Sequence, residues 1–261
     1  MNDSASVTHH IETSRDGAVM VLRFARPEKK NALTLAMYDR LTAALDEAAA
    51  DKSVRAVVFG STSDTFTAGN DLADFAQRPP TGEESPVFRF LKALTTFEKP
   101  LLAAVDGKAI GLGLTMLLHC DLVYASERAQ LIAPFVSLGL VPEAASSLLL
   151  PRLAGHQRAA EILLLGDPVD ARAAHAMGLV NAILPPPEVL PHAISVARRL
   201  AEKPPTALRL SKALLKSEGT QTIADRMRLE GEHFTRQLAS PEVAEAIGAF
   251  FERRKPDFSK F

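Results

Sequence analysis

The sequence has little of what marks several classes of protein. It contains one cysteine, Cys120, so no disulfide can form within the chain. Its 30 Lys and Arg residues are balanced by 31 Asp and Glu residues, so no overall basic field favours nucleic acid or an anionic membrane. No apolar run reaches membrane-spanning length, and the first residues lack the apolar core of a signal peptide. These absences predict a cytoplasmic protein with no nucleic-acid or membrane partner.

What is present is typical of a globular α/β protein. The 261 residues are 47% hydrophobic and 23% charged, which is ample for a packed core. Apolar runs rich in β-branched residues alternate with helical periodicity, which favours crossover connections. The expected strands are 18–24, 54–60, 100–105 and 121–125. The expected helices between them are 34–50, capped by Thr34, then 85–97 and 114–118.

Beyond about residue 155 the pattern becomes mainly helical. The expected helices are 157–165, 171–177, 189–201, 205–217 and 222–238, with one strand at 180–184. Pro185 to Pro187 is expected to form a rigid connector, and Ser61 to Asp71 a loop. We therefore expect a core over residues 1–200, followed by a helical C-terminal region over 201–261.

Two clusters of small residues are candidate sites for exposed backbone N–H groups. Gly111-Leu112-Gly113 precedes a short helix, but Met116 stands where a dinucleotide fingerprint needs its third glycine. A helix N-terminus with glycines can bind a phosphate or stabilise an oxyanion. The alternative is a tight turn with close helix packing. The second cluster, 65–71, also follows a strand, and the sequence alone does not establish whether the two loops converge.

Several motifs together resemble the crotonase (enoyl-CoA hydratase/isomerase) superfamily. They extend over roughly residues 10–200 and comprise Arg26-Pro27-Glu28-Lys29-Lys30-Asn31-Ala32-Leu33, Phe66-Thr67-Ala68-Gly69-Asn70-Asp71-Leu72, Lys99-Pro100 to Gly107, Gly111-Leu112-Gly113, Cys120-Asp121, Gly166-Asp167 and Ala171 to Val180. The resemblance implies a spiral of ββα units and a C-terminal region that assembles trimers or dimers of trimers. It also implies an acyl-CoA thioester substrate, whose coenzyme A is part of the substrate, with no metal or other cofactor.

The same resemblance suggests the residues of the site. It implies that the main-chain N–H groups of Ala68 and Leu112 hold the thioester carbonyl as it becomes an enolate. The residues expected to contact the substrate are Arg26, Lys29, Ala68, Gly69, Asn70, Asp71, Leu72, Gly111 and Phe135. Two alternatives stay open: Asn70 and Asp71 as an Asx turn, and Arg26 and Lys29 as solvated surface cations.

The reaction expected of such a site depends on which carboxylates are present. Hydratases of the family use two glutamates around one water, and those positions are Thr115 and, twenty residues further on, Phe135. Neither side chain can act as a general acid or base near neutral pH. A carboxylate occurs instead at Glu143, within Pro142-Glu143-Ala144-Ala145-Ser146-Ser147, which resembles the peroxisomal-type Δ3,Δ2-enoyl-CoA isomerases. One carboxylate suffices to move a proton from C2 to C4.

Other interpretations remain possible from the sequence. Glu143 could instead be a glutamate in the first turn of a helix, where it would complement the helix dipole. The chain could be a hydratase, another crotonase-type enzyme, or a non-catalytic acyl-CoA-binding protein. His119 is expected to be a buried, hydrogen-bonded core residue, and Cys120 a small buried hydrophobe. Glu230 and Glu232 are expected on a solvated helix face or a subunit contact.

Overall fold

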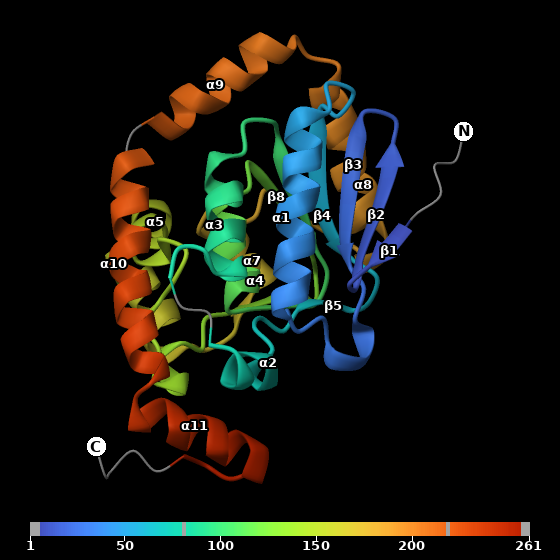
Figure 1. Ribbon diagram of the computed structural model, residues 1–261. Coiled ribbons are helices and arrows are strands. Elements are labelled where there is room, and N and C mark those ends of the chain that lie inside the picture. The colour runs from blue at the N-terminus through green and yellow to red at the C-terminus, as the bar shows by residue number, and fades with distance from the viewer. Residues whose placement is uncertain (1–5, 80–81, 218–219, 257–261) are drawn as a thin grey trace.

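The computed structural model describes residues 6–79, 82–217 and 220–256, and its larger sheet has seven strands in the order β1-β2-β3-β4-β6-β8-β11 (Figure 1). The strands are β1 (Ser6–Thr8), β2 (Ile11–Asp16), β3 (Val19–Phe24), β4 (Ala56–Ser61), β6 (Leu101–Val105), β8 (Leu122–Ser126) and β11 (Ala182–Leu184). β1, β2 and β3 pair antiparallel, and the remaining neighbours pair parallel.

A smaller sheet has four strands in the order β10-β9-β7-β5. They are β5 (Thr65–Thr67), β7 (Lys108–Ile110), β9 (Gln130–Ile132) and β10 (Val169–Asp170). Along the chain β4 leads to β5, β6 to β7 and β8 to β9, so each turn gives one strand to each sheet before a helix follows. The expected spiral of ββα units is therefore confirmed.

The helices surround the two sheets. They are α1 (Leu35–Ala50), α2 (Leu72–Gln77), α3 (Pro86–Thr96), α4 (Leu112–Thr115), α5 (Ser146–Ala154), α6 (His156–Ala160), α7 (Ala171–Ala176), α8 (Pro186–Ala201), α9 (Pro205–Ser217), α10 (Thr220–Leu238) and α11 (Pro241–Glu252), with 3-10 turns at Pro27–Lys29, Met116–His119 and Val136–Leu138 and a π-helical turn at Glu161–Leu165. Thr34 caps α1 through the N–H of Met37, as its sequence predicts, and Ser85 caps α3.

Alternation along the strands gives the large sheet two buried faces. Met20 and Leu22 of β3 face the main core, which also contains residues of α1 and α3. Val19 and Val21 face the opposite side, where α8 packs with Val189 and two alanines. In Figure 1 α1 and α3 lie on one side of this sheet and α8 on the other, so the parallel strands are covered on both faces.

Several expectations were wrong in detail. The expected loop 61–71 contains β5, and Asp71 is the N-cap of α2. The expected connector 185–187 instead starts a helix, because Pro186 and Pro187 occupy the first turn of α8, where a missing N–H costs nothing. β1, β2, β7, β9, β10 and α11 were not anticipated. The division into 1–200 and 201–261 stays a prediction.

Candidate active site

The two small-residue loops converge. β5 and β7 are parallel neighbours, with Thr67 opposite Ala109. Gly69 has φ +79°, and a Cβ there would lie 2.7 Å from the Ile110 carbonyl oxygen, so glycine is required for the approach. On the second loop, a Cβ at Gly113 would lie 2.7 Å from the Thr67 side chain. Pairing within the small sheet therefore brings together the two loops, whose convergence the sequence alone does not establish.

The backbone donors around these loops differ from the expectation for Ala68. Its N–H already donates to the Lys30 carbonyl at 2.9 Å, and the Gly69 N–H donates to Thr67 Oγ1 at 3.1 Å. The role expected for the Ala68 N–H stays a prediction, and this group already has an acceptor within the fold. Within the described ranges, the N–H groups of Asn70 and Leu112 have no hydrogen-bond acceptor. Leu112 is the first residue of α4, whose leading N–H groups have no intrahelical partner.

Glu143 lies on an irregular loop between the turn Val136–Leu138 and α5. Its side chain is buried, and Thr115 Oγ1 donates a short hydrogen bond to its Oε1. Burial is the main cause that raises the pKa of Glu143 to about 8; the Thr115 hydrogen bond opposes the rise and the Glu230 charge adds to it. Helix α5 begins only at Ser146, so Glu143 precedes the helix and does not lie in its first turn.

The two residues after Glu143 are held in an unusual conformation. Ala144 and Ala145 both have φ +55°, in the left-handed region that costs an L-residue roughly 1–2 kcal/mol. The ring Nε2 of His119 hydrogen-bonds the Ala144 carbonyl at 2.8 Å. Burial lowers the pKa of His119 to about 4, so its ring is neutral. The expectation of a buried, hydrogen-bonded histidine is confirmed.

Glu230 of α10 corrects an expectation. It was placed on a solvated face or a subunit contact, yet it is only 6% exposed in this chain. Its carboxylate accepts from the N–H of Ala145 at 2.7 Å and from the N–H and hydroxyl of Ser147. A signal was present in the sequence: Met227, Glu230 and Phe234 share one helical stripe, so the glutamate lies on an apolar face.

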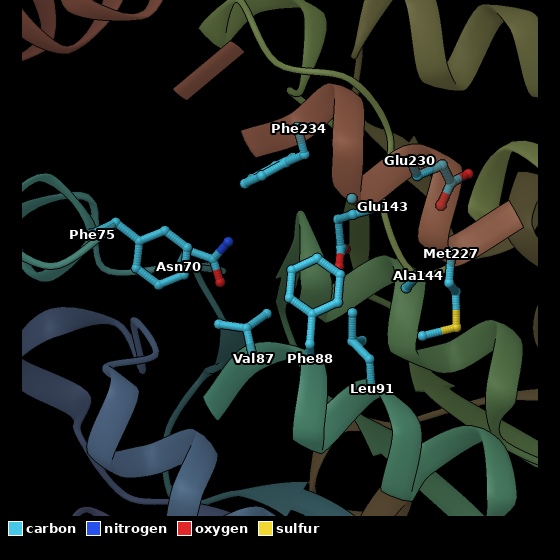
Figure 2. A pocket seen from close by; sticks show the side chains of 11 residues that line it. Asn70, Phe75, Val87, Phe88, Leu91, Glu143, Ala144, Met227, Glu230 and Phe234 are labelled. Atoms are coloured by element: carbon cyan, nitrogen blue, oxygen red, sulfur yellow. The ribbon is translucent and has the colours of Figure 1, made fainter. Parts of the chain in front are cut away.

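A pocket lies between the first small-residue loop and the loop that carries Glu143 (Figure 2). It encloses about 400 Å3 free of atoms, part of it open to solvent. Its lining residues come from the first loop, α2, α3, the Glu143 loop and α10: Asn70, Phe75, Val87, Phe88, Leu91, Glu143, Ala144, Met227, Glu230, Gly231 and Phe234. Figure 2 shows Glu143 pointing into the space between Phe234 and Phe88, with the Asn70 amide on one side. The pocket is mostly apolar, as suits an acyl chain.

The side chain of Asn70 also lies at the pocket. Its Oδ1 accepts a short hydrogen bond from the hydroxyl of Tyr38, a fully buried residue of α1. Burial, and secondarily the Glu143 carboxylate, raise the pKa of Tyr38 well above its ordinary value, so the phenol stays a donor. Sequence reasoning missed Tyr38 because its place in the apolar stripe of α1 gives no sign of a polar role.

The remaining predicted contacts lie outside this pocket. Arg26 donates to Asp71 Oδ2 at 2.7 Å and to the Ala32 carbonyl at 2.9 Å, and Asp71 also caps α2. Lys29 is exposed, and Phe135 is buried in the main core. Leu72 opens α2, and Gly111 precedes α4 with φ +57°. A substrate role for these residues stays a prediction.

Other reactive groups among the described residues form no second candidate site. Burial and Asp121 raise the pKa of Cys120 to about 12, so its thiol is protonated near neutral pH. In the part of the chain that the structure describes, no group of three or more His, Cys, Asp or Glu residues is placed to hold a metal ion. In the same ranges, no helix has the length and apolarity needed to cross a membrane. The absence of a cofactor stays a prediction.

Comparison with known proteins gives the same family throughout. The sequence profile described as "Enoyl-CoA hydratase/isomerase" matches residues 14–260. The chain is 35% identical over 250 residues to "Enoyl-CoA delta isomerase 2" of Rattus norvegicus, covering 94% of this chain and 64% of the rat protein, just under two thirds of its length. It is 35% identical over 261 residues to "Crotonyl-CoA hydratase" of Syntrophomonas wolfei, covering 95% and 97% of the two chains. A crystal structure of an enoyl-CoA hydratase/isomerase from Pseudoalteromonas atlantica superimposes with a TM-score of 0.91 at 43% identity, covering 96% of this chain and 100% of that one.

Proposed function

The chain belongs to the enoyl-CoA hydratase/isomerase family, and we propose that within this family it is a Δ3,Δ2-enoyl-CoA isomerase. The family acts on acyl-CoA thioesters, and its crotonase fold is the one described above. Two carboxylates line the pocket, Glu143 and Glu230, and both oxygens of Glu230 already accept hydrogen bonds from Ala145 and Ser147. The observation that carries the choice of reaction is that this leaves Glu143 as the one carboxylate of the described pocket residues that can act on a substrate.

In this proposal the thioester oxygen is held by the N–H groups of Asn70 and Leu112. Both are without an acceptor among the described residues, and the β5–β7 pairing brings their loops together. Asn70 replaces Ala68, whose N–H is already engaged with Lys30. Donors fixed in advance stabilise the negative charge that develops on the oxygen, and one such donor typically supplies ~3–4 kcal/mol. That stabilisation acidifies the C2 proton.

Glu143 then moves one proton. Its carboxylate removes a proton from C2, the double bond between C3 and C4 becomes part of a dienolate, and the resulting carboxylic acid returns the proton to C4. The product has its double bond between C2 and C3, and Glu143 is again ionised. A pKa of about 8 suits both steps, because it is near the working pH of a group that must accept and donate.

The second carboxylate in the pocket is poorly placed to complete a hydratase pair. Both oxygens of Glu230 accept hydrogen bonds, from Ala145 on one side and from Ser147 on the other. The positions at which hydratases carry their glutamates are Thr115 and Phe135. Hydration remains the second candidate, because relatives of similar identity are named hydratases.

The test is conversion of a 3-enoyl-CoA to its 2-enoyl isomer, followed by the absorbance of the conjugated product. We expect Glu143→Gln and Glu143→Ala to lose activity by roughly 10²- to 10⁴-fold, the usual contribution of a general acid–base group. Glu232→Gln is the matched control, since Glu232 is an exposed glutamate of α10. Unimpaired turnover by both Glu143 variants would overturn the assignment.

A parallel assay separates the alternatives. Hydration of crotonyl-CoA is followed through loss of enone absorbance. Faster hydration than isomerisation by the wild-type protein would favour a hydratase that uses Glu143 with water. Tight binding of acyl-CoA without turnover of either substrate would favour a non-catalytic binding protein.

Assembly into a trimer or a dimer of trimers remains a proposal. The support for it is the apolar surface of α9, on which Leu210 is 52% and Leu215 is 86% exposed. Monomers rarely leave such large side chains in water on one helix. The cytoplasmic location likewise stays a prediction.

A further inference from the structure

One side chain of helix α10, that of Glu230, contacts the backbone next to Glu143. Glu230 lies more than eighty residues beyond Glu143 in the sequence, yet both line the same pocket. The Glu230 carboxylate binds the N–H of Ala145 and both the N–H and the hydroxyl of Ser147. These donors belong to the start of α5, so Glu230 satisfies N–H groups that the helix itself leaves unpaired.

The loop that carries Glu143 includes two residues whose backbone conformation is unfavourable by itself. Ala144 and Ala145 are both in the left-handed conformation, which neither a glycine nor a side-chain cap relieves. Two side chains hold these residues from outside: His119 contacts the Ala144 carbonyl, and Glu230 accepts from the Ala145 N–H. A conformation of this kind persists only where surrounding contacts impose it.

We propose that Glu230 is a positioning residue that fixes the Glu143 carboxyl in the pocket by holding the Ala144–Ala145 backbone in its left-handed conformation. The inference rests on the proposed role of Glu143. It assigns α10 a function within the active site of its own chain, beyond the assembly role expected for the C-terminal region. Figure 2 shows α10 passing beside the pocket, with Glu230 next to the Glu143 loop.

Glu230 also acts on Glu143 through its charge. All its partners are donors, which favours the ionised carboxylate although burial raises its pKa. A second negative charge close to Glu143 raises the pKa of Glu143. Among the described residues, the other titratable or charged groups that face the two glutamates are Tyr38 from α1, neutral His119 from the turn Met116–His119, and Arg226, which donates to Ser147 Oγ at 3.1 Å.

The experiment compares Glu230→Gln, Glu230→Ala and the control Glu232→Gln. A misplacement of about 1 Å in a catalytic group can reduce turnover on the order of 100-fold. We expect kcat of Glu230→Ala to fall roughly 10- to 100-fold with KM changed much less. Glu230→Gln keeps one acceptor oxygen, so its kcat should fall less. In both variants the rising limb of the pH profile should move to lower pH, since loss of the neighbouring charge lowers the pKa of Glu143.

A purely structural cap would give a different result. Melting temperatures are measured alongside, and all rates are taken well below every transition. A lower melting temperature with wild-type kcat and an unmoved pH profile in Glu230→Gln would overturn the proposal. A lower kcat of Glu230→Gln, together with a rising limb of its pH profile at lower pH and with Glu232→Gln unchanged, would support the proposal.

A second measurement separates this proposal from the isomerase assignment. The Glu143 carboxyl can be titrated by carbon-13 NMR in glutamate-labelled protein, with its signal assigned by its loss in Glu143→Gln. This titration needs no turnover, so it is informative even if the substrate is a different acyl-CoA. A lower pKa of Glu143 in Glu230→Gln would support the coupling, and an unchanged pKa would contradict it.

Discussion

The two halves of the proposed active site are built in opposite ways. The oxyanion half consists of main-chain N–H groups on loops that β5 and β7 fix side by side in the small sheet. The acid–base half consists of one side chain, Glu143, on a loop outside both sheets, held by His119 and Glu230. The first half depends on backbone geometry, and the second on hydrogen bonds between distant side chains and the backbone of the Glu143 loop.

This difference predicts where each half is vulnerable. Backbone donors tolerate changes of their own side chains, but they fail where a Cβ would enter the space between the loops. We expect the carboxylate half to tolerate no change at Glu143, and its pKa to depend on neighbours such as Thr115. Substitutions in the two halves should therefore give different kinetic signatures.

After the Glu143 variants, the largest effect is expected from Gly69→Ala in the oxyanion half. The new Cβ would meet the Ile110 carbonyl oxygen at 2.7 Å at a residue with φ +79°, so the two loops must separate. Displacing one donor should lower kcat/KM by roughly 10²- to 10³-fold. Steady-state kinetics on a 3-enoyl-CoA measures the loss.

Gly17→Ala is the matched control for this change. Gly17 also has positive φ, +56°, but a Cβ there meets no atom within 4 Å. It should cost about 1 kcal/mol of stability through backbone strain and leave kcat/KM unchanged. If Gly69→Ala kept wild-type kcat/KM, the oxyanion half would not depend on close approach of the loops.

The sequence predicted the elements around the oxyanion half better than the two short strands that carry its loops. Periodicity and Thr34 predicted α1, and apolar runs predicted β3, β4 and β6. β5 and β7 have three residues each, too few for alternation to be recognised. The choice between Ala68 and Asn70 depends on which N–H already has an acceptor, and only the position of the Lys30 carbonyl decides that.

The sequence indicated only one residue of the proposed acid–base half. Glu143 was identified through a motif, because a local run of residues carries it. Glu230 was not, since its partners lie more than eighty positions away and the residues near it are charged. The apolar stripe of α10 indicates that Glu230 is buried, but it does not specify the contacts with Ala145 and Ser147, which are set by the packing of α10 on the core.

A smaller effect is expected from Thr115→Val, which tests the tuning of Glu143. The substitution keeps the shape but removes the hydroxyl that donates to Glu143 Oε1. That hydrogen bond lowers the pKa of Glu143, so without it the pKa rises above about 8. The base must be ionised, so the rising limb of kcat/KM moves to higher pH. At pH 7 we expect a loss of about 3- to 10-fold that is recovered at high pH.

The pH profile from pH 6 to about 10 measures this shift. Thr96→Val is a suitable control, because Thr96 is exposed and its hydroxyl bonds only the Lys92 carbonyl of its own helix, at 2.9 Å. A Thr115→Val profile that moved to lower pH, or did not move, would contradict the role given to the hydroxyl.

The smallest effect is expected from Gly231→Ala, where α10 meets the acyl pocket. A Cβ at Gly231 would lie 2.6 Å from the Phe88 ring, which must turn toward the cavity or away from it. Gly248→Ala on α11 makes the same helix substitution with no atom within 4 Å, and should only stabilise, by about 0.5–1 kcal/mol. We expect KM of Gly231→Ala to rise roughly 2- to 5-fold for longer acyl chains while kcat stays near wild type, since a poorer fit of remote chain atoms changes binding more than chemistry. Equal KM changes for short and long chains would place the acyl chain elsewhere than beneath α10.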